Sequence, residues 1–159
     1  MKKKLDATDR KILALLQQNA ETPLADLAQA VNLSSTPCWR RIQRLREHGF
    51  ITRQVALVDA RKINLAVTAF VAVRTNQHNQ AWFDSFRDAV RDIPEIVEFY
   101  RMSGDVDYLL RVVVPDIEGY DAVYKRLIAA LEMLDVSASF SLETIKSTTA
   151  LPLNYVKPD

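Results

Sequence analysis

The hydrophobic positions of the first 50 residues recur at helical spacing in three successive segments. The spacing predicts one helix over residues 5–19, a second from about Pro23 to Asn32 and a third over 37–48. Asn32 suits the end of the second helix because asparagine tolerates the left-handed backbone of a sharp turn. A short turn then joins the second and third helices, and the pattern predicts a helix-turn-helix over residues 24–43.

The ends of the first and third helices carry residues suited to those positions. Asp6 or Thr8 can cap the first helix with a side-chain oxygen. Thr36 is the candidate N-cap of the third helix, and it is followed by Pro37, whose fixed backbone angle suits a first helical residue. Gly49 is expected to end that helix.

The third helix is predicted to bury one face and to expose the other. Cys38, Ile42 and Leu45 recur at the spacing of one helical face and are expected to pack inward. The opposite face is expected to carry Thr36, Arg40, Gln43, Arg44 and Glu47. Residues 40–53 hold five arginines and a single acidic residue. So basic a surface favours an anionic partner.

Short β-type runs follow the third helix. Phe50-Ile51 and residues 55–58 are expected to form two strands around residues 52–54, the shape of a small wing. Polar residues 59–64 then interrupt the pattern, and the domain junction is placed there.

Two domains are thus predicted, over residues 1–60 and 61–159. The second alternates strand and helix, with strands expected over 66–74, 96–102, 107–114 and from Val136, and helices over 79–92 and from Asp116. This β-α-β-β-α-β order is the ferredoxin-like arrangement, so the fold class is α+β, a winged helix-turn-helix followed by a ferredoxin-like domain. The apolar parity of the last strand slips near Glu143-Thr144, which indicates a bulge or a change of pairing partner across an interface.

The net charge of +1 hides an uneven distribution. Residues 1–53 hold ten basic and five acidic residues, a net charge of +5, whereas residues 54–159 hold 11 basic and 15 acidic residues, a net charge of −4. A basic segment joined to an acidic remainder suggests that only the first part approaches an anion.

The cysteine and histidine content excludes two classes of site. Cys38 is the sole cysteine and there are two histidines, so neither a disulfide framework nor a zinc cluster is expected. The position of Cys38 on the buried helix face favours an inert packed residue over a redox-active thiol. No apolar run approaches the roughly 20 residues that span a bilayer, so no membrane partner is expected and a cytoplasmic location is predicted.

The third helix is expected to lie in the major groove of double-stranded DNA. There Arg40 or Arg44 can bond guanine edges or phosphates, and Gln43 can read adenine. Trp39 either packs on the sugar-phosphate edge or covers the flank of its own helix. Any three-helix bundle carries basic residues on a solvated face, but the density of arginine and the predicted wing favour DNA binding. The residues predicted to bind DNA are Ser35, Thr36, Pro37, Trp39, Arg40, Arg41, Gln43, Arg44 and Arg53.

A tight turn between two predicted strands places Asp105 and Asp107 next to Gly104. Two carboxylates at this spacing would suit acid–base chemistry, but no nucleophile, histidine or metal cluster accompanies them, so no catalytic residue is predicted. Asp107 begins an apolar strand and is expected either to bind the ammonium group of a small ligand or to fix the turn.

Several short motifs in a fixed order resemble one family along essentially the whole chain. They are Asp9-Arg10-Lys11-Ile12-Leu13, Leu33-Ser34-Ser35-Thr36-Pro37-Cys38, Arg41-Ile42-Gln43-Arg44-Leu45, Gly49-Phe50-Ile51, Gly104-Asp105-Val106-Asp107-Tyr108, Pro115-Asp116 and Thr149-Ala150-Leu151-Pro152-Leu153. The chain resembles the Lrp/AsnC ("feast/famine") regulators, and within them the subgroup that contains the cysteine-detoxification regulator of enteric bacteria. Asn32 stands where the family usually has glycine.

The resemblance implies a DNA-binding head joined to a domain that binds an effector and assembles the protein. It implies homodimers formed through the sheet of the second domain, octamers of four dimers, no cofactor, and an amino-acid effector held between dimers near the glycine turn. The positions it implies for effector binding are Tyr100, Met102, Ser103, Gly104, Asp107, Ile117, Ser139, Phe140 and Ser141.

The sequence thus predicts a sequence-specific transcriptional regulator of amino-acid metabolism. Its operator is expected to be pseudo-palindromic, and cysteine, leucine or methionine are the candidate effectors. Two alternatives are an architectural protein of the nucleoid with little sequence preference and, with far less support, an amino-acid-metabolising enzyme whose ferredoxin-like half is catalytic or allosteric.

Overall fold

The computed structural model describes residues 5–130 and 134–155. These residues form two compact units: the chain up to Leu57 together with the segment from Lys146 onward, and Val58–Ile145. The sequence prediction assigned residues 61–159 to one domain, so the observed division differs at the C-terminal end.

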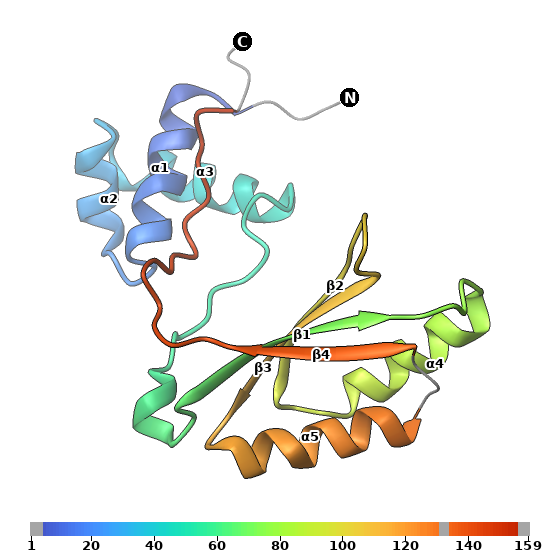
Figure 1. The fold of residues 1–159 in the computed structure, drawn as a ribbon. Coiled ribbons are helices and arrows are strands. Elements are labelled where there is room, and N and C mark those ends of the chain that lie inside the picture. Colours follow the sequence, from blue (N-terminus) through green and yellow to red (C-terminus); the bar gives the residue numbers. More distant parts are fainter. Residues whose placement is uncertain (1–4, 131–133, 156–159) are drawn as a thin grey trace. The chain divides into compact units, whose positions relative to one another are not determined.

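The first unit is built on three helices, α1 (Ala7–Gln18), α2 (Leu24–Ala30) and α3 (Ser35–Glu47) (Figure 1). Asp6 is the N-cap of α1, and its side chain accepts a hydrogen bond from the Asp9 backbone N–H at 2.7 Å. Asn32 adopts a φ of 55°, the left-handed conformation predicted for the turn between α2 and α3.

Helix α3 begins earlier than predicted. Ser34 is its N-cap, with an extended backbone, and its carbonyl accepts the N–H of Cys38 at 3.2 Å. Thr36 therefore lies within the first turn and does not cap the helix. The early start is possible because Pro37 lies in the first turn, where backbone N–H groups have no partner inside the helix.

No part of the segment over residues 50–58 is a strand. The side chains of Val55, Leu57 and Val58 are 60%, 74% and 66% exposed. A strand needs a neighbouring strand to pair with, and no described strand pairs with this segment. The short apolar runs that predicted a wing are present, but the wing strands are not.

The last described segment packs on the helical unit. The side-chain amide of Gln17 donates to the Leu151 carbonyl at 3.2 Å and accepts the Leu151 N–H at 2.7 Å. Leu153 packs against the core of the three helices. These contacts explain why the C-terminal segment groups with α1 and not with the sheet that precedes it.

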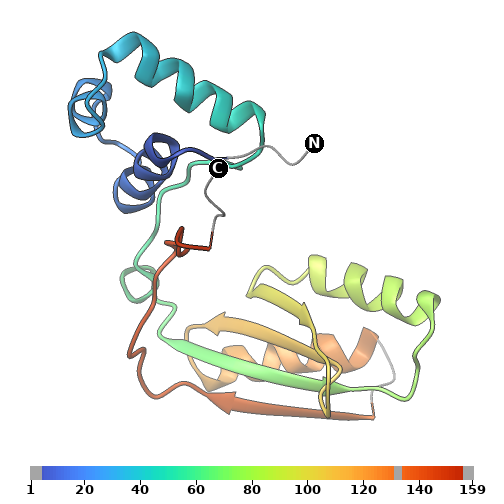
Figure 2. The ribbon, with the colours of Figure 1, turned by 90° about the horizontal axis from the view of Figure 1, so that it is seen from above.

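The second unit is the predicted ferredoxin-like fold. Its elements are a 3₁₀ turn (η1, Ala60–Ile63), β1 (Val67–Arg74), α4 (Gln80–Arg91), β2 (Ile96–Arg101), β3 (Tyr108–Val114), α5 (Ile117–Ala130) and β4 (Asp135–Phe140). The sheet is antiparallel with the order β2-β3-β1-β4, and α4 and α5 cover one of its faces (Figure 1). Figure 2 shows β4 at the edge of the sheet beside β1.

The core of this unit lies between the sheet and its two helices. Alternate residues of β1, including Val71 and Val73, are fully buried against Phe86 of α4 and Leu127 of α5. Each such side chain contributes about 1.5–3 kcal/mol through removal of apolar surface from water. Within the described part of this unit, no helix covers the opposite face of the sheet.

Strand β4 ends sooner than the apolar pattern suggested. After Phe140 the N–H of Ser141 still donates to the Thr68 carbonyl at 2.9 Å, but Leu142 and Ile145 are 97% and 90% exposed. No bulge forms near residues 143–144, because the described chain provides no partner for the strand beyond that point.

Candidate functional site

Helix α3 has the two faces that its spacing predicted. Cys38, Ile42 and Leu45 are buried among the residues of α1 and α2. Burial raises the pKa of the Cys38 thiol, and nearby Arg41 only partly opposes this effect. The thiol is therefore kept neutral in the core, as expected for a packed residue.

The predicted DNA-binding side chains are mostly accessible to solvent. Ser35, Thr36, Pro37, Trp39, Arg40, Arg44 and Arg53 are exposed, whereas Arg41 and Gln43 are half-buried. Trp39 keeps 51% of its surface exposed on the flank of the helix. The first two turns of α3 thus expose the hydroxyls of Ser35 and Thr36, the indole of Trp39 and the guanidinium of Arg40.

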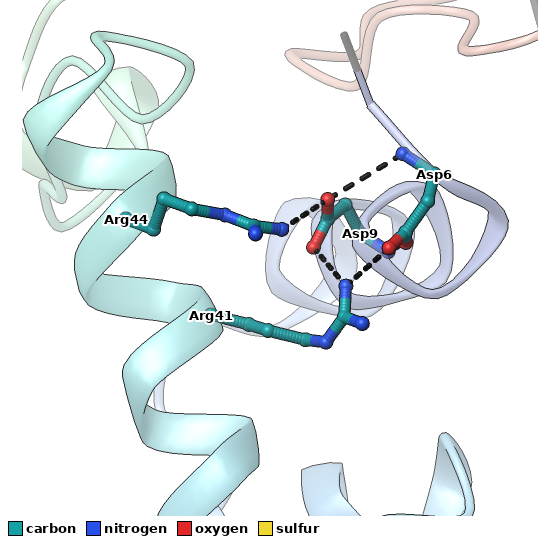
Figure 3. A network of polar contacts seen from close by, with 4 residues as sticks. All are labelled: Asp6, Asp9, Arg41 and Arg44. Carbon is teal, nitrogen blue, oxygen red and sulfur yellow. Dashed lines mark hydrogen bonds and ion pairs between the residues drawn. The ribbon is translucent and has the colours of Figure 1, made fainter. Parts of the chain in front are cut away.

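A cluster of four charged residues links α1 to α3 (Figure 3). Arg41 Nη1 pairs with Asp6 and, at 2.8 Å, with Asp9 Oδ1. Arg44 Nη2 lies 2.7 Å from Asp9 Oδ2. The Asp9 side chain is only 2% exposed, whereas that of Arg44 is 47% exposed. We call Asp6, Asp9, Arg41 and Arg44 the ionic cluster.

Two members of the ionic cluster, Asp6 and Arg41, are held in their charged forms. Burial alone would raise the pKa of Asp6, but hydrogen bonds from the Arg41 guanidinium and from the Asp9 backbone lower it below its ordinary value. Hydrogen bonds to Asp6 and Asp9 raise the pKa of Arg41. Both groups therefore remain ionised at neutral pH.

The structure divides the five arginines of residues 40–53 into two groups. Arg41 and Arg44 belong to the ionic cluster, and Arg46 Nη2 donates to Gln54 Oε1 at 2.8 Å. Arg40 and Arg53 are exposed and make no hydrogen bond or ion pair with the described residues. The sequence analysis assigned Arg40, Arg41, Arg44 and Arg53 to DNA binding, and it did not anticipate the ion pairs of Asp6 and Asp9 with Arg41 and Arg44. A signal was present, because Asp9 lies at the helical spacing of buried Ile12 and Leu13.

Asp107 fixes the turn between β2 and β3. Its Oδ2 accepts the N–H of buried Thr75 at 2.9 Å, and its backbone carbonyl accepts the N–H of Met102 at 2.8 Å. His78 Nδ1 lies 3.9 Å from the other carboxylate oxygen. Gly104 adopts a φ of 112°, which favours glycine at this position. Asp107 Oδ2 is thus already engaged in a hydrogen bond within the chain.

Most of the predicted effector residues fall at two edges of the sheet. Tyr100, Met102, Ser103 and Gly104 lie on β2 or in the turn after it, whereas Ser139, Phe140 and Ser141 lie on or beside β4. Asp107 ends the turn next to β1, where its N–H donates to the Val73 carbonyl at 3.1 Å. Strands β3 and β1 separate these edges. Ile117 is exposed at the start of α5. One copy of the chain therefore does not gather these residues into a single site.

Tyr100 and Phe140 each have an aromatic or polar partner. Tyr100 donates its hydroxyl to Glu98 Oε2 at 3.0 Å, and this hydrogen bond raises the pKa of the phenol. The ring of Phe140 meets that of Tyr120 edge-on, with centroids 5.1 Å apart. Within the described ranges, no group of three or more histidine, cysteine or acidic residues could hold a metal ion.

Two family models match the chain in the order of its two predicted domains. The AsnC-type helix-turn-helix domain matches residues 5–46, and the Lrp/AsnC ligand binding domain matches residues 68–151. The chain belongs to the Lrp/AsnC family of transcriptional regulators. Membership confirms the resemblance inferred from the motifs. Among residues 5–130 and 134–155, no helix is both long and apolar enough to cross a membrane.

Curated relatives of this family member are regulators and not enzymes. It is 49% identical to the DNA-binding transcriptional activator DecR of Escherichia coli K12, over 94% of this chain and 99% of that protein. It is 46% identical to the glutamate uptake regulatory protein of Zymomonas mobilis, over 96% of this chain and 93% of that protein.

Solved structures of the family share the fold along nearly the whole chain. An AsnC family regulator from Agrobacterium tumefaciens is 57% identical with a TM-score of 0.93, covering 96% of this chain and all of that one. A regulator from Neisseria meningitidis, solved as a complex with L-Met, is 34% identical with a TM-score of 0.91, covering 96% of this chain and 99% of that one.

Proposed function

We propose that this protein is a sequence-specific regulator of genes of amino-acid metabolism, and that α3 reads its operator in the major groove. The observation that carries the proposal is the exposed face of α3, where Thr36, Trp39 and Arg40 stand on a helix whose other face is buried. Arg40 and Arg53 supply positive charge without a partner in the described chain, and the arginine-rich surface suits phosphate and base contacts.

A gel-shift titration tests this proposal. The probe is the duplex upstream of the protein's own gene, and a random-sequence duplex of equal length is the competitor at one fixed salt concentration. Specific binding is expected to be at least about a thousandfold tighter than binding to the random duplex. Equal affinity for the two duplexes would instead identify an architectural DNA-binding protein.

The proposed effector is a small amino acid, with methionine, cysteine and leucine as the candidates. The ligand binding domain of the family and the L-Met complex of the Neisseria relative support this chemical class. The proposed contacts are Tyr100, Met102, Ser103, Gly104, Asp107, Ile117, Ser139, Phe140 and Ser141. A thermal-shift screen of the twenty amino acids tests it, because a ligand that binds only the folded state raises the melting temperature.

The proposed assembly is a homodimer formed through the uncovered face of the sheet, with four dimers in an octamer. That face carries Phe70, which is 41% exposed, beside the Arg111–Glu98 ion pair at 2.6 Å. The position of the effector residues at two sheet edges supports a site completed by another copy. A symmetric dimer would present two α3 helices, so we propose a pseudo-palindromic operator.

A further inference from the structure

The carboxylate of Asp9 is the centre of the ionic cluster. Its Oδ1 binds Arg41 and its Oδ2 binds Arg44, so both oxygens hold guanidinium groups from successive turns of α3. The backbone N–H of Asp9 also donates to the side chain of Asp6, the N-cap of α1. The backbone N–H of Asp6 donates to Asp9 Oδ2 at 3.4 Å and the Asp9 side chain is almost fully buried, so the start of α1 helps to orient this carboxylate.

The two arginines are not held in the same way. Arg41 uses Nη1 for both Asp6 and Asp9, and its side chain is 28% exposed. Arg44 binds Asp9 through Nη2 alone and keeps nearly half of its side-chain surface in solvent. The remaining nitrogens of Arg44 can therefore donate outward while Asp9 holds the guanidinium in one plane.

The cluster also cancels charge on the predicted DNA-binding surface. Two carboxylates oppose two guanidinium groups, so Arg41 adds little to the field that a phosphate would experience. Arg40 lies one residue before Arg41 but has no partner in the described chain. Neighbouring arginines of one helix thus have different environments.

We infer that Asp9 is a positioning residue for DNA recognition, which orients Arg44 toward the operator and reserves Arg41 for the contact between α1 and α3. The inference rests on the proposed recognition of DNA by α3. It predicts that Asp9 sets sequence preference although it contacts no DNA, and that Arg41 makes no phosphate contact although it lies on the recognition helix.

The first experiment compares Asp9→Asn with the wild type in the gel-shift assay described above. Asparagine keeps the size of the side chain but cannot hold two guanidinium groups by charge. The ratio of specific to random-duplex affinity is expected to fall about tenfold, because Arg44 loses its fixed orientation. Circular dichroism measures the fraction of folded protein in each sample, and affinities are calculated from the folded concentration. Lower stability of the variant therefore does not mimic weaker binding.

Glu21→Gln is the matched control. It removes one negative charge from the same unit, but Glu21 is exposed and its side chain forms no hydrogen bond or ion pair with another described residue. The ratio of affinities is expected to stay at the wild-type value. An unchanged ratio in Asp9→Asn as well would overturn the inference.

A second experiment keeps the inference testable if Asp9→Asn does not fold. Arg40→Gln and Arg41→Gln each remove one positive charge from α3, and their binding to the random duplex is measured across salt concentrations. Arg40→Gln is expected to reduce the slope of log affinity against log salt by about 0.9 per bound chain, whereas Arg41→Gln should leave the slope unchanged. Equal reductions would show that Arg41 contacts phosphate, and the inference would fail.

The wild type distinguishes the failure of this inference from that of the proposed function. If the wild type shows no preference for the upstream duplex, the proposed sequence-specific recognition fails. If the wild type shows the preference and Asp9→Asn retains it, only the role of Asp9 fails.

Discussion

The two units of this chain differ in how completely one copy forms its site. In the helical unit, the exposed residues of α3 stand together on one surface, and the ionic cluster that supports them is satisfied within the chain. In the sheet unit, most of the proposed effector residues lie at two edges separated by two strands. The uncovered sheet face carries half-exposed Phe70.

This difference indicates that the two functions respond differently to assembly. A helix that reads DNA is an element of a single chain, and its local geometry does not require a second copy. The proposed effector site, divided between two sheet edges, would require one, so we expect effector binding to favour assembly and assembly to favour effector binding. The predictions below test this separation in order of decreasing effect.

The largest effect is expected from Phe70→Glu on the uncovered sheet face. A carboxylate placed in the proposed interface is costly to desolvate, so the dimer should weaken by about 3 kcal/mol, roughly a hundredfold. Light scattering over a dilution series measures the change in assembly. Effector binding should be lost with assembly, and the folded helical unit should remain.

Ala122→Glu is the control for this prediction, because Ala122 is exposed on α5, on the other side of the sheet. It adds the same charge away from the proposed dimer face and should leave the dimer intact. If the Phe70→Glu monomer still binds its amino acid with wild-type affinity, the site is complete in one chain and the comparison is wrong.

The sequence could predict the features that depend on local spacing. Cys38, Ile42 and Leu45 recur with the helical period, so the buried face of α3 follows from periodicity alone. Asn32 and Gly104 suit backbone conformations that few other residues adopt. The order of strands and helices in the second unit limited its topology to few arrangements, and the ferredoxin-like prediction was confirmed.

Arg40→Ala is expected to have the next largest effect, now on DNA binding. Loss of an unpaired guanidinium from α3 should weaken binding to the upstream duplex by about 2 kcal/mol, roughly thirtyfold. Gel shift measures the affinity, and light scattering and calorimetry check that assembly and effector binding are unchanged. A change in oligomer size in this variant would show that Arg40 lies at an interface between copies.

The features that the sequence could not predict depend on contacts between distant segments. The pairing of Asp9 with Arg44 joins residues 35 positions apart, and it depends on how α1 and α3 are rotated about their axes. The contact between Gln17 and Leu151 spans 134 positions and has no periodic pattern. The wing strands were predicted from short apolar runs, but such a run does not supply the neighbouring strand that residues 55–58 lack.

A smaller effect is expected from Asp107→Ala at the glycine turn. The N–H of buried Thr75 would lose its acceptor, at a cost of about 1 kcal/mol, and the turn should loosen. Calorimetry with L-methionine as the probe should show an affinity for methionine about fivefold lower than that of the wild type. The affinity for DNA in the absence of the amino acid should be unchanged.

Asp105→Asn, at the exposed acid of the same turn, is the control for this prediction. Unchanged methionine affinity in Asp107→Ala would remove this carboxylate from the effector site.

The smallest effect is expected from Asp6→Asn, which tests whether the ionic cluster stabilises the helical unit by charge. Asparagine can still cap α1, so the substitution removes the ion pair with Arg41 and retains the cap. The pKa of Asp6 is lowered below its ordinary value in the folded state. Its contribution to stability is therefore fully present above that ordinary value and is lost as the pH falls through the lower, folded-state pKa. Urea unfolding should therefore find the wild type more stable than the variant at pH 7, with the difference shrinking only below about pH 4. Because Asp6 is partly exposed, salt should also reduce the difference.

A stability difference that stays constant from pH 7 to pH 2 would assign the effect of Asp6→Asn to capping and packing. The helical unit would still be complete within one chain and the sheet unit would still depend on assembly, but this separation would then rest on the geometry of α3 and not on its charges.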